Sequence, residues 1–103
     1  MKESELVRKV LAVLNSLPEC KAIKVHGSPY ARAGTPDIIG CCKGRMFALE
    51  VKMAGRKPTK IQERELAAWG AAGAIAGTFY SDDSIGDLVY WLEKGENDES
   101  CLG

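Results

Sequence analysis

GTPDIIGCCKGRMFALEVKM, residues 34–53, contains two apolar runs on either side of the dipeptide Lys43-Gly44. Both runs are rich in residue types that favour β-strands. A glycine-containing dipeptide between two such runs is typical of a tight hairpin turn, although Lys is not the residue that usually precedes Gly there. We therefore predict strands over 36–42 and 45–53, joined as an antiparallel hairpin.

This hairpin brings two acidic residues together. A loop of two or four residues centred on the turn places Ile38 opposite Leu49 and Asp37 opposite Glu50, whereas a three-residue loop would shift the pairing. Directly opposed side chains have Cβ atoms about 4.5 to 5.5 Å apart, and like charges so placed destabilise a sheet. Strand periodicity puts Lys52 on the same face. The acidic pair therefore needs a compensating group.

An amphipathic helix is expected over residues 3–17, because apolar residues recur there at helical spacing and Pro18 ends the segment. Glu3 falls in the middle of the apolar stripe, whereas Glu5 falls on the opposite side. A carboxylate on a buried face is costly unless it is paired, hydrogen-bonded or bound to a cation. In the first turn it also interacts favourably with the helix dipole, so both interpretations of Glu3 stay open.

The remaining elements follow from periodicity and from turn residues. Together they predict an α/β fold in which helices flank one small mixed β-sheet, in the order α, β, β, β, α, β, α. We expect residues 1–94 to form a single domain and residues 95–103 to be a mobile acidic tail. The other predicted elements are a strand over 21–26, a loop over 27–34, a helix from Thr59 to about Ala72, a strand over 74–80 and a last helix from Ile85.

Gln62 has two possible roles. Thr59-x-x-Gln62 fits a capping box at the start of a helix, which explains Gln62 structurally. Gln62 also lies on the same side of that helix as Leu66 and Trp69, the side that should meet the sheet. Both roles remain open on the sequence alone.

Composition indicates an ordinary soluble globular chain. The 103 residues are 46% hydrophobic and 27% charged, with no apolar run long enough to span a bilayer and no signal-peptide pattern at the start. We expect a cytoplasmic protein. The cysteines lack the Cys-x2-Cys spacing of zinc sites, and Cys41 and Cys42 should point to opposite faces of a strand. The other two cysteines are Cys20 and Cys101.

The net charge of zero conceals an asymmetry. Residues 1–81 hold 13 Lys/Arg and 7 Asp/Glu, whereas residues 82–103 hold 1 and 7. A surface that binds a polyanion is therefore compatible with the first four-fifths of the chain, and an ordinary mixed surface with an acidic tail is the alternative. The candidate phosphate contacts are Arg56, Lys57 and Lys60, followed by Arg32 and Lys43.

The candidate site residues share one chemistry, since they are oxygen donors with one amine. Oxygen ligands suit Mg²⁺ or Mn²⁺, and a divalent cation between Asp37 and Glu50 would turn their repulsion into coordination. Such a site would support metal-assisted hydrolysis of a phosphodiester, with Lys52 near the attacking water or the developing charge. No Gly-rich phosphate loop is present, so a nucleotide cofactor is not expected. The candidates are Asp37, Glu50, Lys52, Gln62 and Glu3.

The motifs Gly34-Thr35-Pro36-Asp37, Leu49-Glu50-Val51-Lys52 and the helical Gln62 resemble the PD-(D/E)XK nuclease superfamily, and in particular its small VRR-NUC branch. The resemblance covers about residues 3–81. It implies a restriction-endonuclease-like core and a Mg²⁺- or Mn²⁺-dependent DNA endonuclease, similar to Holliday-junction resolvases, acting on branched or flapped DNA. Stand-alone members of the branch are homodimers and occur in phages and bacteria.

The resemblance also implies a role for each residue of the site. Asp37, Glu50 and the backbone carbonyl of Val51 would be metal ligands, and Lys52 would be the catalytic lysine. Gln62 would orient water or the scissile phosphate. The acid of the first helix maps best to Glu3, with Glu5 as the alternative.

Three other interpretations compete with the nuclease. The acidic pair and Lys52 fit an ion-pair ladder on a solvated sheet face, but this leaves the acids in an otherwise apolar strand unexplained. A catalytically silent nucleic-acid-binding subunit of the same fold is the main alternative. A small-molecule hydrolase using the same metal would need a pocket that the sequence does not indicate.

Overall fold

The computed structural model describes residues 1–26 and 32–94 of the chain. Within them the elements follow the predicted order. The predicted acidic tail, residues 95–103, and most of the predicted loop over 27–34 lie outside the described residues. The elements are α1 (Glu3–Ser16), β1 (Cys20–Lys24), β2 (Ile38–Cys42), β3 (Arg45–Lys52), α2 (Lys60–Ala71), β4 (Ile75–Tyr80) and α3 (Ile85–Lys94).

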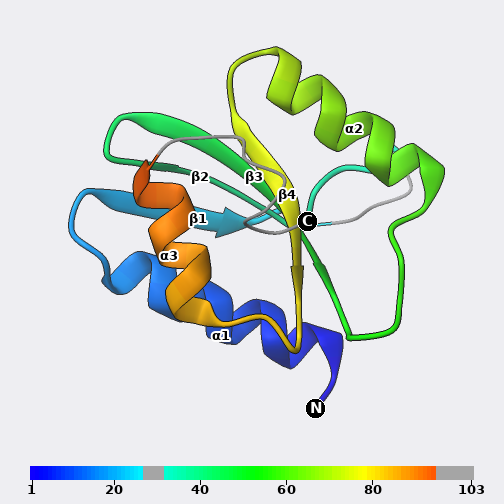
Figure 1. Ribbon diagram of the computed structural model, residues 1–103, viewed down its shortest axis with the longest axis horizontal. Helices are drawn as coiled ribbons and strands as arrows, with labels where there is room; N and C mark the ends of the chain where they lie inside the picture. Colours follow the sequence, from blue (N-terminus) through cyan, green and yellow to red (C-terminus); the bar gives the residue numbers. More distant parts are fainter. Residues whose placement is uncertain (27–31, 95–103) are drawn as a thin grey trace.

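The strands form one mixed sheet in the order β1-β2-β3-β4 (Figure 1). β2 is antiparallel to both of its neighbours, β1 and β3, and β4 runs parallel to β3. A parallel partner requires a crossover connection, and α2 supplies it. This arrangement confirms the predicted α/β fold with a small mixed sheet.

The β2–β3 hairpin has the predicted register, with Ile38 opposite Leu49 and Cys42 opposite Arg45. The two turn residues, Lys43 and Gly44, both have positive φ, 50° and 83°. This is the backbone of a type I′ turn, whose twist matches that of the flanking strands. Lys43 adopts the left-handed conformation although it has a side chain. The two-residue loop therefore excludes the shifted pairing of a three-residue loop.

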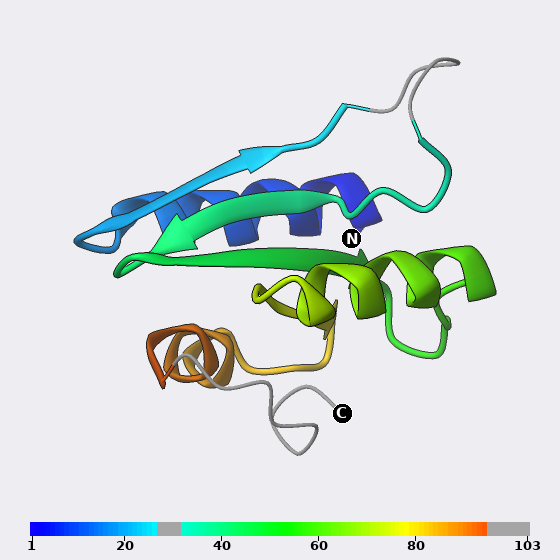
Figure 2. The same cartoon turned by 90° about the horizontal axis from the view of Figure 1, so that it is seen from above.

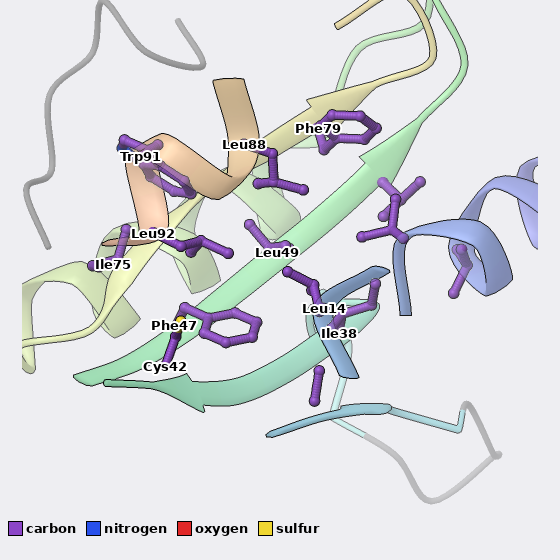
Figure 3. Packing of buried hydrophobic residues seen from close by; sticks show 14 of the residues in the cluster. Leu14, Ile38, Cys42, Phe47, Leu49, Ile75, Phe79, Leu88, Trp91 and Leu92 are labelled. Carbon is purple, nitrogen blue, oxygen red and sulfur yellow. The ribbon is translucent and has the colours of Figure 1, made fainter. Parts of the chain in front are cut away.

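The two faces of the sheet are covered differently. α1 and α3 pack on the face that carries Phe47, Leu49 and Val51, and this is the main hydrophobic core (Figure 3). α2 packs on β3 and β4 from the other side, so that α1 and α2 lie on opposite sides of β3 (Figures 1 and 2). No residue of α2 is fully buried. The core face and the face below α2 are thus distinct.

The side chains of β3 alternate between these two faces of the sheet. Successive side chains of a strand point to opposite faces. Phe47, Leu49 and Val51 therefore enter the main core, while Ala48 and Glu50 point to the face of α2, and all five are buried. Over these residues β3 is therefore buried on both faces, and a carboxylate lies under α2.

Trp91 and the three described cysteines, Cys20, Cys41 and Cys42, occupy structural positions, and Cys101 lies outside the described residues. Trp91 is buried in the core with Leu92. Cys42 is buried and Cys41 is exposed, as predicted from strand alternation. Burial raises the pKa of the Cys20 thiol to about 12, and the neighbouring Cys42 adds to this effect, so Cys20 is a weak nucleophile.

Among the described residues, no helix is both long and apolar enough to cross a lipid bilayer.

Candidate functional site

Asp37 and Glu50 lie at the end of the sheet away from the hairpin turn. Asp37 immediately precedes β2, and continuing the register by one step from the Ile38–Leu49 pair puts it opposite Glu50. The Asp37 carboxylate accepts a hydrogen bond from the Val51 backbone N–H through Oδ2, at 2.8 Å. Its own carbonyl accepts from the Val25 N–H, also at 2.8 Å. Strands on both sides therefore hold Asp37 in place.

Glu50 is a buried carboxylate with one unpartnered oxygen. The residue is 2% exposed. Its Oε1 accepts a hydrogen bond from Gln62 Nε2 at 3.2 Å, whereas Oε2 is shielded from solvent and has no hydrogen-bond partner among the described residues. Burial, and after it the Asp37 carboxyl opposite, raise the pKa of Glu50 from its ordinary 4.5 to about 9. The raised pKa means that ionising Glu50 at this position is costly, so an acidic residue here is unfavourable for stability alone.

Gln62 performs both of the roles that the sequence left open. Its side-chain Oε1 accepts from the Thr59 backbone N–H at 2.8 Å, and its own N–H donates to Thr59 Oγ1 at 3.2 Å, which completes the capping box. Because the amide oxygen faces the cap, the amide nitrogen points to Glu50. The cap of α2 thus orients the group that contacts the buried acid.

Glu3 and Lys52 also act on Glu50. The Lys52 charge lowers the pKa of Glu50 and the Glu3 charge raises it, and both effects are smaller than those of burial and of Asp37. Glu3 is half-buried in the first turn of α1, whereas Glu5 is exposed. Of the two candidate acids of α1, Glu3 is the one whose charge contributes to the raised pKa of Glu50. Within residues 1–26 and 32–94, no ion pair engages Lys52.

The candidate phosphate contacts fall into two groups. Arg56, Lys57 and Lys60 are exposed along the connection from β3 to the start of α2, and no ion pair within the described chain engages them. Arg32 pairs with Glu65 at 3.1 Å, and Lys43 pairs with Glu93 at 2.7 Å.

Lys43 lies far from the acids. It occupies the hairpin turn, seven residues from Glu50 along β3, which corresponds to roughly 23 Å at the rise of a strand. The hydrogen bond to Glu93 raises the pKa of Lys43, so the ammonium form is favoured there. A ligand at the acidic pair would reach Lys43 only if it extended over the length of the sheet.

The donor set fits a hard divalent cation. Glu50 offers an unpartnered buried oxygen, and Asp37 offers a carboxylate at the opposed position. The N–H and C=O of one strand residue point to the same side, so the Val51 carbonyl faces the side on which its N–H meets Asp37. In the described part of the chain, no group of three or more His, Cys, Asp or Glu side chains gathers around a point. Mg²⁺ is suited to such a site because it is usually bound by one or two carboxylates and keeps several waters.

Several contacts of the site had no signal in the sequence. Arg32 pairs with Glu65, which is distant from it in the sequence. Gly34 lies against Ile61 of α2, which is also distant in the sequence. Thr78 lies next to Glu50 in the register of β3 and β4 and is buried. Thr78 is the one aliphatic hydroxyl in the segment AIAGTFY, residues 74–80, and the sequence gives no further sign that it lies beside an acid.

The fold is similar to that of two solved structures. One is described as a VRR_NUC domain; it is 23% identical, and the match covers 90% of this chain and 97% of that chain with a TM-score of 0.64. The other is Hjc, a Holliday junction resolvase from the archaeal hyperthermophile Archaeoglobus fulgidus; it is 23% identical, and the match covers 78% of this chain and 69% of that chain with a TM-score of 0.58. The sequence matches no family model and no curated protein. The likeness confirms the predicted restriction-endonuclease-like fold.

Replacing Glu50 with Gln should stabilise the metal-free protein above about pH 5. Since the pKa of Glu50 is raised from its ordinary 4.5 to about 9, its contribution to stability is complete below pH 4.5 and is lost as the pH rises towards 9. Gln cannot ionise, and its amide can donate to Asp37. Urea unfolding in EDTA should show the variant more stable by about 1 to 3 kcal/mol near pH 8.

The control for this measurement is Glu5→Gln, which removes an exposed carboxylate from α1. The difference in free energy of unfolding between this variant and the wild type should change little over the same pH range. If the free energy of unfolding changed with pH in the same way for the wild type and for Glu50→Gln, this result would contradict the unpartnered state of the buried carboxylate.

Proposed function

We propose that this protein is a Mg²⁺- or Mn²⁺-dependent DNA endonuclease that hydrolyses phosphodiester bonds. The observation that carries the proposal is the buried carboxyl group of Glu50, which faces Asp37 and has one oxygen without a hydrogen-bond partner among the described residues. A folded chain that retains such a costly group needs a ligand for it. The fold adds support, because Hjc is a Holliday junction resolvase.

The residues that would hold the metal are Asp37, Glu50 and the carbonyl of Val51. When bound, the metal would supply Lewis-acid stabilisation of the phosphate and a more acidic water. Gln62 keeps the Glu50 carboxylate in place through Nε2. The Lys52 ammonium, on the same face of β3, stabilises the negative charge that builds on the phosphate oxygens in the transition state. Glu3 adds negative charge on the side of α1 and so strengthens the attraction for a cation.

The proposed substrate is DNA with a branched or flapped structure. Arg56, Lys57 and Lys60 extend a positive surface from the acidic pair along the start of α2, where phosphates of a bound duplex would lie. Arg32 and Lys43 contribute where their partners Glu65 and Glu93 give way to phosphate. The preference for branched substrates is proposed from the likeness to a resolvase.

We also propose that the protein is a homodimer. α2 packs on β3 and β4 and leaves the same face of β1 uncovered. Ile23 on this face is 51% exposed, its partner Ile39 on β2 is half-buried, and so is Met46 on β3. An exposed apolar patch of this kind is suited to an interface.

Cleavage assays test the nuclease. Purified protein is incubated with supercoiled plasmid and with labelled flap, splayed and four-way DNA in Mg²⁺, Mn²⁺ or EDTA. We expect metal-dependent cleavage, and Lys52→Ala should reduce its rate at least about 100-fold while DNA binding is kept, because one group that stabilises the transition state is lost.

The matched control is Lys21→Ala, which removes an exposed lysine from β1. It should cleave at the wild-type rate. If folded wild-type protein binds DNA but cleaves no substrate with either metal, the chain is a nucleic-acid-binding subunit and the nuclease proposal is wrong.

The salt dependence of DNA binding tests the phosphate contacts. Removing Arg56, Lys57 and Lys60 together should lower the slope of log affinity against log salt by roughly 2 to 3, because each lost phosphate contact on duplex DNA removes about 0.9. A variant lacking Lys21, Arg45 and Lys94 has the same net charge, with the changes on other surfaces. Equal slopes for these two variants would show that the loop before α2 is not the DNA surface.

Light scattering during size-exclusion chromatography tests the dimer. The wild type should have twice the mass of the chain, and Ile23→Glu should be monomeric because a charge would be buried in the interface. Tyr90→Glu changes another exposed apolar residue, on α3, and should stay dimeric. A monomeric wild type at about 100 µM, well above the Kd of most stable complexes, would contradict the proposal.

A further inference from the structure

The loop that leads to Asp37 is pressed against the first turn of α2 at Gly34. Gly34 has φ +79°, a conformation that residues with a side chain rarely adopt. A Cβ at this position would lie 2.5 Å from Ile61 Cγ2, 2.8 Å from the Ile61 carbonyl oxygen and 2.9 Å from the Ile61 carbonyl carbon. Two of these three atoms belong to the backbone of the helix. Glycine is therefore required here both for its φ and for the space.

A second contact joins the same loop to the same side of α2. Arg32 Nε pairs with Glu65 Oε2 at 3.1 Å. Ile61 and Glu65 are four residues apart, so they lie on one side of the helix. The Thr35 backbone N–H and hydroxyl both donate to the Arg32 carbonyl and close a turn between the two contacts. The loop thus lies against α2 as one unit.

This unit connects two halves of the candidate site. At one end it continues through the buried Pro36 into Asp37. At the other end it meets Ile61, the residue before Gln62, whose Nε2 donates to Glu50 at 3.2 Å. The separation between loop and helix therefore controls where the Gln62 amide lies relative to the acidic pair.

We propose that Gly34 is a positioning residue of the site, which holds the first turn of α2 at the distance where Gln62 can bind Glu50. The effect on metal binding and cleavage rests on the proposed function, but the effect on Gln62 does not. With alanine at this position, the Ile61 backbone cannot rotate away, so the helix must move outwards by several tenths of an ångström or more. A hydrogen bond already at 3.2 Å then exceeds normal bonding distance.

Side-chain amide NMR of the metal-free protein tests the proposal directly. The Gln62 NH₂ signals are identified by their loss in Gln62→Ala. In Gly34→Ala these signals should shift and exchange faster with solvent, because the bond to Glu50 is broken. In Gly44→Ala they should not change. Gly44 has a similar φ of +83° with nothing within 4 Å of an added Cβ, so this control has the backbone strain without the steric contact.

A double-mutant cycle with Gln62→Ala separates positioning from general destabilisation. Gly34→Ala and Gln62→Ala should each weaken Mn²⁺ affinity by about tenfold, and the double variant should be no weaker than Gln62→Ala, because coupled residues are not additive. For each variant of the cycle, Mn²⁺ affinity is measured by calorimetric titration and the cleavage rate is measured on DNA. Full additivity, or a Gly34→Ala variant that behaves like Gly44→Ala, would overturn the proposal.

Two further outcomes are distinguishable. If the wild type neither binds Mn²⁺ nor cleaves DNA, the proposed function fails, and the NMR comparison alone decides the role of Gly34. If Gly34→Ala does not fold, Glu65→Gln replaces it, since this variant weakens the second contact without adding bulk. A smaller shift of the Gln62 signals in the same direction is expected from Glu65→Gln, and unchanged signals would refute the positioning role.

Discussion

The rest of the site depends on one unfavourable interaction, the placement of two carboxylates at opposed positions of a buried hairpin. Glu50 is shielded from solvent, and Asp37 faces it across the strand pair. The Val51 N–H and the Gln62 amide each satisfy one oxygen of this pair, and in the part of the chain that the structure describes Glu50 Oε2 has no hydrogen-bond partner. The compensation within the chain is therefore incomplete. A protein selected for stability alone would place an apolar residue at position 50, as it does at the neighbouring positions of β3.

The hairpin and its acidic pair were predictable from the sequence because they depend on local rules. A two-residue turn determines the register, and strand alternation then places Asp37 and Glu50 on one face. The capping box of Thr59 and Gln62 was equally visible. The position of Gly34 against Ile61 was not, since it depends on how far a loop and a distant helix approach each other. The ion pairs of Arg32 and Lys43 were not predictable either, because their partners are distant in sequence. These pairs leave fewer unpaired cations for phosphate binding than the count of basic residues indicates.

The two roles of Gln62 are compatible for a simple geometric reason. An amide has an acceptor and a donor at opposite ends, so the oxygen can cap α2 while the nitrogen binds Glu50. A carboxylate at this position would keep the cap but would bring a third negative charge to the pair. A lysine would neutralise Glu50 but could not accept from the Thr59 N–H. Glutamine combines both functions, which is why the alternatives left open by the sequence do not exclude each other.

The site also depends on the hairpin turn, although the turn lies at the other end of the sheet. Because side chains alternate along β3, Leu49 enters the core formed with α1 and α3 while Glu50 points towards α2. A register slip of one residue would exchange the two faces, placing the carboxylate in the apolar core and Leu49 beside Asp37. Lys43 and Gly44, both at positive φ, prevent this slip by closing the loop with two residues. The conformational cost at Lys43 is thus offset by the correct placement of every side chain along the strand, including those of the site.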